Sequence, residues 1–197
     1  QVNNKIINTK DLYFVPSLKF NGDSQILSLK LNVSETQFLE YQYYLKNDND
    51  YMLGFSIKSK GLSMIIDKLQ PAKFQWDLMA LSHDQSVDFE NRYTRLNFQY
   101  DGDKLNKLSQ TGEDIEIIDD VSWISYRQHF FSSILVPDLP IKTAEVKSFD
   151  LINESTIVDY NSKTLKFTEK NSAFLEEPIN NKRFTKKYST KYSIPFI

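Results

Sequence analysis

The chain contains no cysteine, and among its 197 residues there are only 5 glycines and 6 prolines. The lack of cysteine excludes disulfides, thiolate catalysis and cysteine-ligated zinc. No apolar run approaches the roughly 18 residues that a membrane-spanning helix requires, so we expect the chain by itself to be soluble. Its 24 basic and 26 acidic residues give a net charge of -2. Without an excess of positive charge, the composition argues against nucleic acid as a partner.

Aromatic residues are abundant instead, with 14 Phe and 11 Tyr, and β-forming residues crowd the apolar segments. This composition predicts an all-β fold with at most short helical segments, and it favours a β-sandwich over a helical bundle. A chain of this length can bury about two thirds of its unfolded surface in one core. We therefore predict a single domain over residues 1–197.

Alternation of apolar and polar residues, the period of a half-buried strand, predicts six strands. The first three follow one another at residues 27–33, 39–45 and 51–57, with the turn-forming run 47–50 before the third, which indicates an antiparallel meander. Further strands are predicted at 74–80, 96–100 and 184–196. Pro195 makes the last of these an edge strand.

Helical periodicity is weak, and only residues 103–109 and the region around Gln128 could form a turn or two of helix. The segment 82–86 is expected to be flexible, and the acidic stretch 112–120 is expected to be a loop that leads into a strand. The polar region 153–181 has few apolar residues, which is typical of a mobile insertion.

Few residues could carry catalysis. His83 beside Asp84, together with the distant His129, is the only arrangement that could support acid–base chemistry, and neighbours in a strand point apart. The two histidines lack metal-ligand spacing, and the turn 101–103 (Asp-Gly-Asp) lacks the other positions of a calcium loop, so it is read as a hairpin turn. We predict no catalytic residues, no metal and no cofactor, and a chain that is not an enzyme.

A basic cluster lies towards the end of the chain. It could contact acidic lipid headgroups or form a solvated strand face. Its members are Lys182, Arg183, Lys186, Lys187 and Lys191. We nominate no binding residues from the sequence.

The densest aromatic segment is the run 120–135, Asp-Val-Ser-Trp-Ile-Ser-Tyr-Arg-Gln-His-Phe-Phe-Ser-Ser-Ile-Leu. Its bulky residues fall at helical spacings, although its beginning has strand character, so we predict a strand, a short helical turn and a strand. The aromatic side chains are expected to pack in the core. Truncating Trp123 or Phe131 to Ala should then cost about 3–5 kcal/mol through cavity formation.

The order of residues from Trp123 to Leu135 resembles the signature of the large periplasmic domain of the YidC membrane-protein insertase family. The segments 8–14, 38–45 and 90–94 fit the same family in order, and the likeness thins past Lys147. The resemblance implies a twisted β-supersandwich, similar to galactose mutarotases. The chain, which begins with Gln1, would be a processed or excised piece that lacks the first strands and the closing helical part of that domain.

The resemblance also implies a function: a non-catalytic domain of a protein that inserts and folds inner-membrane proteins, alone or beside the Sec translocon. The full-length protein would be tethered at the periplasmic face of the bacterial inner membrane, and its partners would be Sec components and nascent membrane proteins. The likeness to mutarotases leaves a second hypothesis, a carbohydrate-binding or sugar-modifying domain. In that case Trp76 or a tyrosine would stack on a pyranose ring in a cleft that also holds carboxylates.

Overall fold

The computed structural model describes residues 7–47, 51–66, 72–81, 87–151 and 184–194. The chain divides into two compact units, the first formed by Gln1–Ala72 with Ile194–Ile197 and the second by Lys73–Ser193. Helices in the described residues are limited to three short segments, η1 (Thr9–Asp11), η2 (Leu62–Met64) and α1 (Val87–Asn91). None of these is long or apolar enough to cross a membrane.

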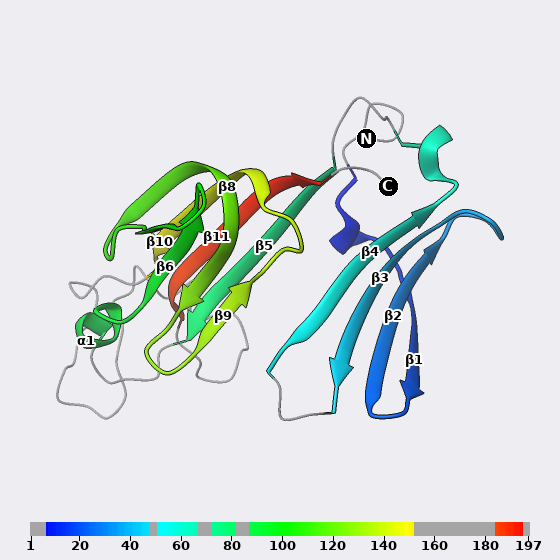
Figure 1. The fold of residues 1–197 in the computed structure, drawn as a ribbon, viewed down its shortest axis with the longest axis horizontal. Coiled ribbons are helices and arrows are strands. Elements are labelled where there is room, and N and C mark those ends of the chain that lie inside the picture. The colour runs from blue at the N-terminus through cyan, green and yellow to red at the C-terminus, as the bar shows by residue number, and fades with distance from the viewer. Residues whose placement is uncertain (1–6, 48–50, 67–71, 82–86, 152–183, 195–197) are drawn as a thin grey trace, which may run out of the picture. The chain divides into compact units, whose positions relative to one another are not determined.

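The first unit is a four-stranded antiparallel meander in which the strands pair in chain order (Figure 1). Its strands are β1 (Val15–Asn21), β2 (Ser24–Asn32), β3 (Phe38–Lys46) and β4 (Leu53–Lys60). The predicted three-stranded meander is confirmed as β2–β4. Strand β1 was not predicted, because its alternation covers only Leu18 and Phe20 and because Pro16 argues against a strand. Proline is tolerated on an edge, which is where β1 lies.

The register of this sheet separates its residues into two different faces. Leu27 is opposite Tyr43, which is opposite Phe55, so side chains of one kind line up across the strands. One face, called here the apolar face, carries no charged residue. It is formed by Pro16, Leu18, Phe20, Gln25, Leu27, Leu29, Leu31, Leu39, Tyr41, Tyr43, Leu45, Leu53, Phe55, Ile57 and Ser59.

The second unit is built on one seven-stranded sheet. Its strands are β5 (Ala72–Leu81), β6 (Arg95–Tyr100), β7 (Lys104–Lys107), β8 (Glu113–Arg127), β9 (Ser132–Leu135), β10 (Ile141–Asp150) and β11 (Phe184–Ile194). Their order in the sheet is β5-β11-β10-β8-β6-β7, and β9 also pairs with β8. The predicted strands at 74–80, 96–100 and 184–196 are found as β5, β6 and β11. The last lies between β5 and β10 rather than at an edge.

Strand β8 bends, and the sheet folds over with it (Figure 1). The part from Glu113 to Val121 pairs with β10, whereas the part from Val121 to Arg127 pairs with β6. Between them Asp120 has a left-handed backbone (φ 54°), and the pairing with β6 shifts register at the same level. A bulge of this kind sharpens the twist of a strand and redirects it.

Hydrogen bonds of Tyr126 show how far the sheet folds. In the sheet, β8 is three strands away from β5, a separation of about 14 Å if the sheet were flat. Nevertheless the Tyr126 hydroxyl lies 2.9 Å from the carbonyl oxygen of Trp76 on β5 and 2.6 Å from the hydroxyl of Thr190 on β11. The second half of β8 therefore lies over the face of β5 and β11, and the predicted all-β, antiparallel β-sandwich is confirmed.

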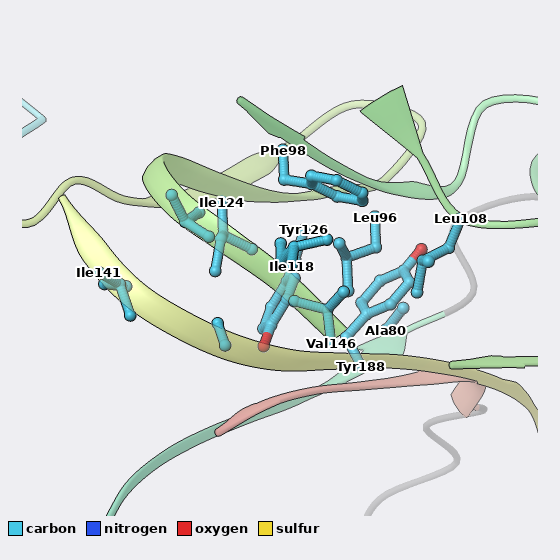
Figure 2. Packing of buried hydrophobic residues seen from close by; sticks show 12 residues of the cluster. Ala80, Leu96, Phe98, Leu108, Ile118, Ile124, Tyr126, Ile141, Val146 and Tyr188 are labelled. Atoms are coloured by element: carbon cyan, nitrogen blue, oxygen red, sulfur yellow. The ribbon is translucent and has the colours of Figure 1, made fainter. Parts of the chain in front are cut away.

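The core of the second unit fills the space between these layers (Figure 2). Tyr126 stacks on Trp76 (ring centroids 4.0 Å apart) and on Tyr188 (5.1 Å). Burial raises the pKa of both tyrosine hydroxyls well above the ordinary value. The buried apolar cluster consists of Ala80, Leu96, Phe98, Leu108, Ile118, Val121, Ile124, Tyr126, Ile141, Ala144, Val146 and Tyr188.

Several predictions about local structure are wrong. The acidic stretch 112–120 is not a loop but the first part of β8. Ile115 and Ile117 are exposed there, whereas Glu116 lies on the side that faces the core, so the usual alternation is inverted. The segment 103–109, a candidate for a turn or two of helix, instead contains strand β7, which forms a hairpin with β6.

The region around Gln128 also has no helix. It is a tight hairpin loop between β8 and β9, in which the Gln128 amide donates to the Phe131 carbonyl at 2.7 Å. The helix α1 and the strand β10 were not predicted. The segments 82–86 and 153–181, most of the turn 47–50, and Pro195 lie outside the described residues.

The aromatic run 120–135 is only partly in the core, which corrects the prediction for it. Tyr126 is fully buried, but Phe130 and Phe131 are 64% and 61% exposed, and Trp123 is half-buried on the opposite face of β8 from Tyr126. Trp123 and Tyr126 are three residues apart in a strand and therefore point to opposite faces, whereas Phe130 and Phe131 belong to the β8–β9 loop.

We expect the matched substitutions Phe98→Ala and Phe131→Ala to differ strongly. Phe98 is completely buried, so its truncation should lower the free energy of unfolding by about 3–5 kcal/mol. Phe131→Ala leaves no internal cavity and should cost less than about 1 kcal/mol. Urea unfolding of the two variants beside the wild type measures both values. A large loss for Phe131→Ala would contradict the exposed position of this ring.

Candidate functional site

The histidines are the residues in which sequence reasoning looked for catalysis. His83 and Asp84 lie outside the described residues. His129 lies in the β8–β9 loop, where its ring stacks on Tyr93 (4.4 Å) and Phe130 (4.2 Å). Phe89 of α1 meets the same imidazole edge-on at 5.5 Å. His129 therefore joins α1 to the β8–β9 loop through ring contacts.

No group of three or more His, Asp or Glu in the part of the chain that the structure describes could hold a metal ion. The sequence Asp101-Gly102-Asp103 forms the turn between β6 and β7, as predicted. Asp101 and Gly102 both have positive φ there (46° and 81°). The Asp101 carboxylate pairs with Lys104 at 2.5 Å, a geometry of hairpin turns rather than of cation loops.

Trp76 was a candidate platform for a sugar ring. In the structure it stacks on Tyr126 at an interplanar angle of 16° and packs against the core of the second unit. The side chain thus contributes to the junction between the two layers. Tyr100, by contrast, lies beside carboxylates in a hollow.

Tyr100 lines a hollow of about 500 Å³ at the bend of β8, called here the acidic hollow. Its lining residues are Tyr100, Asp101, Glu116, Ile117, Ile118, Asp119, Asp120 and Lys142. The hollow exists because the bend brings the β6–β7 turn against β8, with the Asp101 amide 3.1 Å from the Asp120 carbonyl oxygen. Asp119 accepts a hydrogen bond from Thr143 at 2.6 Å.

The environment of Glu116 affects its ionisation. Burial raises the pKa of this carboxyl above its ordinary value of 4.5, and the nearby charge of Asp114 adds to the effect. A carboxyl with a raised pKa in a hollow is a feature of both acid catalysts and structural sites. No local sequence pattern indicates this hollow, because it depends on the bend in β8.

The first unit has a second hollow, of about 370 Å³, on the face opposite the apolar face. It is lined by Val15, Ser17, Lys19, Ile26, Ser28, Lys30, Asn32, Glu40 and Gln42. Glu40 of β3 is the acidic residue of this lining: Ser28 donates to its Oε1, and the Gln42 amide donates to the same oxygen at 3.0 Å. The Ser28 hydrogen bond is the main cause that lowers the pKa of Glu40, and Gln42 and the charges of Lys58 and Lys30 act in the same direction.

One member of the predicted basic cluster lies inside the protein, which corrects the reading of that cluster as a solvated face. Lys186 is completely buried; its ammonium group pairs with Asp150 at 3.0 Å and donates to the Gln110 carbonyl. Lys187 and Lys191 alternate with the core-facing residues and are half-buried, while 182–183 lie outside the described residues. Lys186 and Tyr188 are two residues apart in the strand, so their side chains point to the same face. This spacing could have revealed that Lys186 is buried with Tyr188.

Comparisons with known proteins relate the chain to one kind of protein. No family model matches it, and no solved structure matches it. The membrane protein insertase YidC of Parabacteroides distasonis is 33% identical over 135 residues, which cover 68% of this chain and 21% of that protein. The YidC of Porphyromonas gingivalis is 30% identical over 140 residues (70% and 22%), and that of Azobacteroides pseudotrichonymphae is 26% identical over 164 residues (82% and 26%). The chain thus spans about a fifth to a quarter of these relatives.

We expect Glu116→Gln and Glu40→Gln to change stability in opposite directions at neutral pH. The pKa of Glu116 is raised on folding, so its stabilising contribution is present at low pH and is lost as the pH rises through the folded value. Removing its charge should stabilise the chain at pH 7. The pKa of Glu40 is lowered, so its contribution is present above 4.5 and is lost as the pH falls, and Glu40→Gln should destabilise at pH 7.

Because both carboxyls are partly exposed, each change should stay within about 1 kcal/mol. Thermal unfolding at pH 7 and pH 3 measures the effects, and the difference between each variant and the wild type should shrink at the lower pH. Shifts of the same sign in both variants would show that one of the two environments is assigned incorrectly.

Proposed function

Because the chain is a relative of the YidC membrane protein insertases over about 70–80% of its length, we propose that residues 1–197 form a single periplasmic domain of such a protein. The rest of that protein, which would be roughly twice as long as this chain, would hold the domain at the inner membrane. The order of the similar segments along the chain and the β-sandwich of the second unit support this proposal.

The proposed role is that of a non-catalytic module. It would assist the rest of the protein as nascent membrane proteins are inserted and folded, with or beside the Sec translocon. The ring contacts of His129 favour a structural role for the histidine that sequence reasoning considered for catalysis. The edge strand β1 is exposed along its whole length and offers backbone groups to a partner.

Location on the periplasmic side can be tested with introduced cysteines, because the chain has none of its own. In the full-length protein, Ser56→Cys on β4 and Ser132→Cys on β9 place thiols at exposed positions. A membrane-impermeant maleimide should label both in intact spheroplasts. Ser148→Cys, at a position that is only 1% exposed, is the matched control and should react only after denaturation. Labelling of Ser56→Cys and Ser132→Cys only in permeabilised cells would refute the periplasmic location.

The same exposed thiols test the association with the translocon. Bifunctional reagents attached at Ser56→Cys or Ser132→Cys should form adducts with Sec components in membranes if the domain docks there. Adducts formed only from the membrane part of the protein would argue against a docking role for this domain.

A second candidate function is favoured by the acidic hollow. Tyr100 lies there beside Asp101 and Glu116, which is the combination of an aromatic ring and carboxylates that sugar recognition requires. The hollow could thus serve a carbohydrate-binding or sugar-modifying domain. Calorimetric titration with monosaccharides tests this: saturable binding that Tyr100→Ala abolishes would support it, and heats indistinguishable from dilution would rule it out.

A further inference from the structure

The strands of the first unit separate charge as well as hydrophobicity. The face opposite the apolar face carries five lysines: Lys19 on β1, Lys30 on β2, Lys46 on β3, and Lys58 and Lys60 on β4. Its only acidic residue is Glu40, so this basic face has a net charge of +4 in a chain whose net charge is -2. Positive charge is therefore concentrated on one side of one small sheet.

The register arranges these charges in rows across the sheet. Lys30, Glu40 and Lys58 are direct cross-strand neighbours, and Ser28 and Gln42 also bind the carboxylate of Glu40. Lys30 is held over the ring of Phe38, with its ammonium 4.0 Å from the ring centroid. Lys19, Lys58 and Lys60 are exposed. Glu40 thus offsets part of the charge at the centre, while amines remain exposed at the sides.

We propose that the basic face is a docking surface for the anionic phosphate headgroups of a lipid bilayer. The proposal rests on the proposed function, which places the domain at a membrane. The hollow of about 370 Å³ on this face offers Lys19, Lys30, Ser17 and Asn32 as donors around a concave surface that can receive a headgroup. The uncharged apolar face opposite adds no negative charge that would weaken the field of the lysines.

The strength of such docking follows from the number of lysines that reach the surface. Each lysine close to an anionic membrane strengthens binding roughly fivefold, within about a Debye length of the headgroups. The individual contacts are weak and sensitive to salt. Attachment of the domain to the same membrane would supply a high effective concentration, so weak docking would be sufficient.

The experiment is flotation of the 197-residue chain with vesicles of phosphatidylcholine, with and without phosphatidylglycerol. We expect binding only to the vesicles that contain phosphatidylglycerol, and its loss as the salt concentration rises. The triple variant Lys19→Gln, Lys58→Gln, Lys60→Gln should bind roughly a hundredfold more weakly. The matched control Lys73→Gln, Lys104→Gln, Lys107→Gln removes three exposed lysines of the second unit and should bind within about threefold of the wild type.

Circular dichroism of both triple variants shows whether they fold like the wild type. Three results would each overturn the proposal. These are an equal loss of vesicle binding in the two triple variants, equal binding of the wild type to both kinds of vesicle, and no binding to the anionic vesicles. If the basic face recognises an acidic protein instead of lipid, the chain should not bind the anionic vesicles. Cysteine labelling tests the location of the domain without using any lysine. If the introduced cysteines are labelled in intact spheroplasts but the chain does not bind vesicles, the docking surface is refuted and the proposed periplasmic location is not.

Discussion

The second unit depends on one strand that serves both layers of its sandwich. β8 pairs with β10 before its bulge and with β6 and β9 after it, so the bend at Asp120 creates the interior. The Tyr126 hydroxyl then joins the layers through Trp76 and Thr190. A buried polar group left without a partner costs about 1–3 kcal/mol, so these bonds favour a single arrangement of the layers. The core, the acidic hollow and the β8–β9 loop all follow from this geometry.

Alternating patterns predicted strands in which apolar and polar residues alternate regularly, as in β2, β3 and β6. Predictions failed where polar residues face inward: Glu116 made a strand resemble an acidic loop, and Lys186 made a buried position resemble a solvated one. The two hollows could not be predicted in the same way. They arise from twist and from a bulge between residues distant in sequence, such as Asp101 and Asp120, whose proximity no local pattern encodes.

Two of the segments that resemble the insertase family, both in the second unit, meet in space. The segment 90–94 comprises the end of α1 and the residues after it, and the run 120–135 forms the end of β8, its loop and β9. The two touch where Tyr93 stacks on His129. The aromatic residues of the run therefore act at a junction on the surface of the second unit as well as in its core. This division explains why residues of one short segment have such different exposure.

The position of β11 in the sheet affects how the second unit can be completed during synthesis. β11 is the last described strand of the chain, yet it lies between β5 and β10, and Lys186 joins it to Asp150 on β10 and to Gln110 before β8. While residues 184–194 remain in the ribosome, β5 and β10 lack the strand that separates them, and the Asp150 carboxylate lacks its cation. Because domains emerge from the ribosome N-terminus first, this unit can close only at the end of translation of the segment. Until then its two open strand edges would be accessible to chaperones.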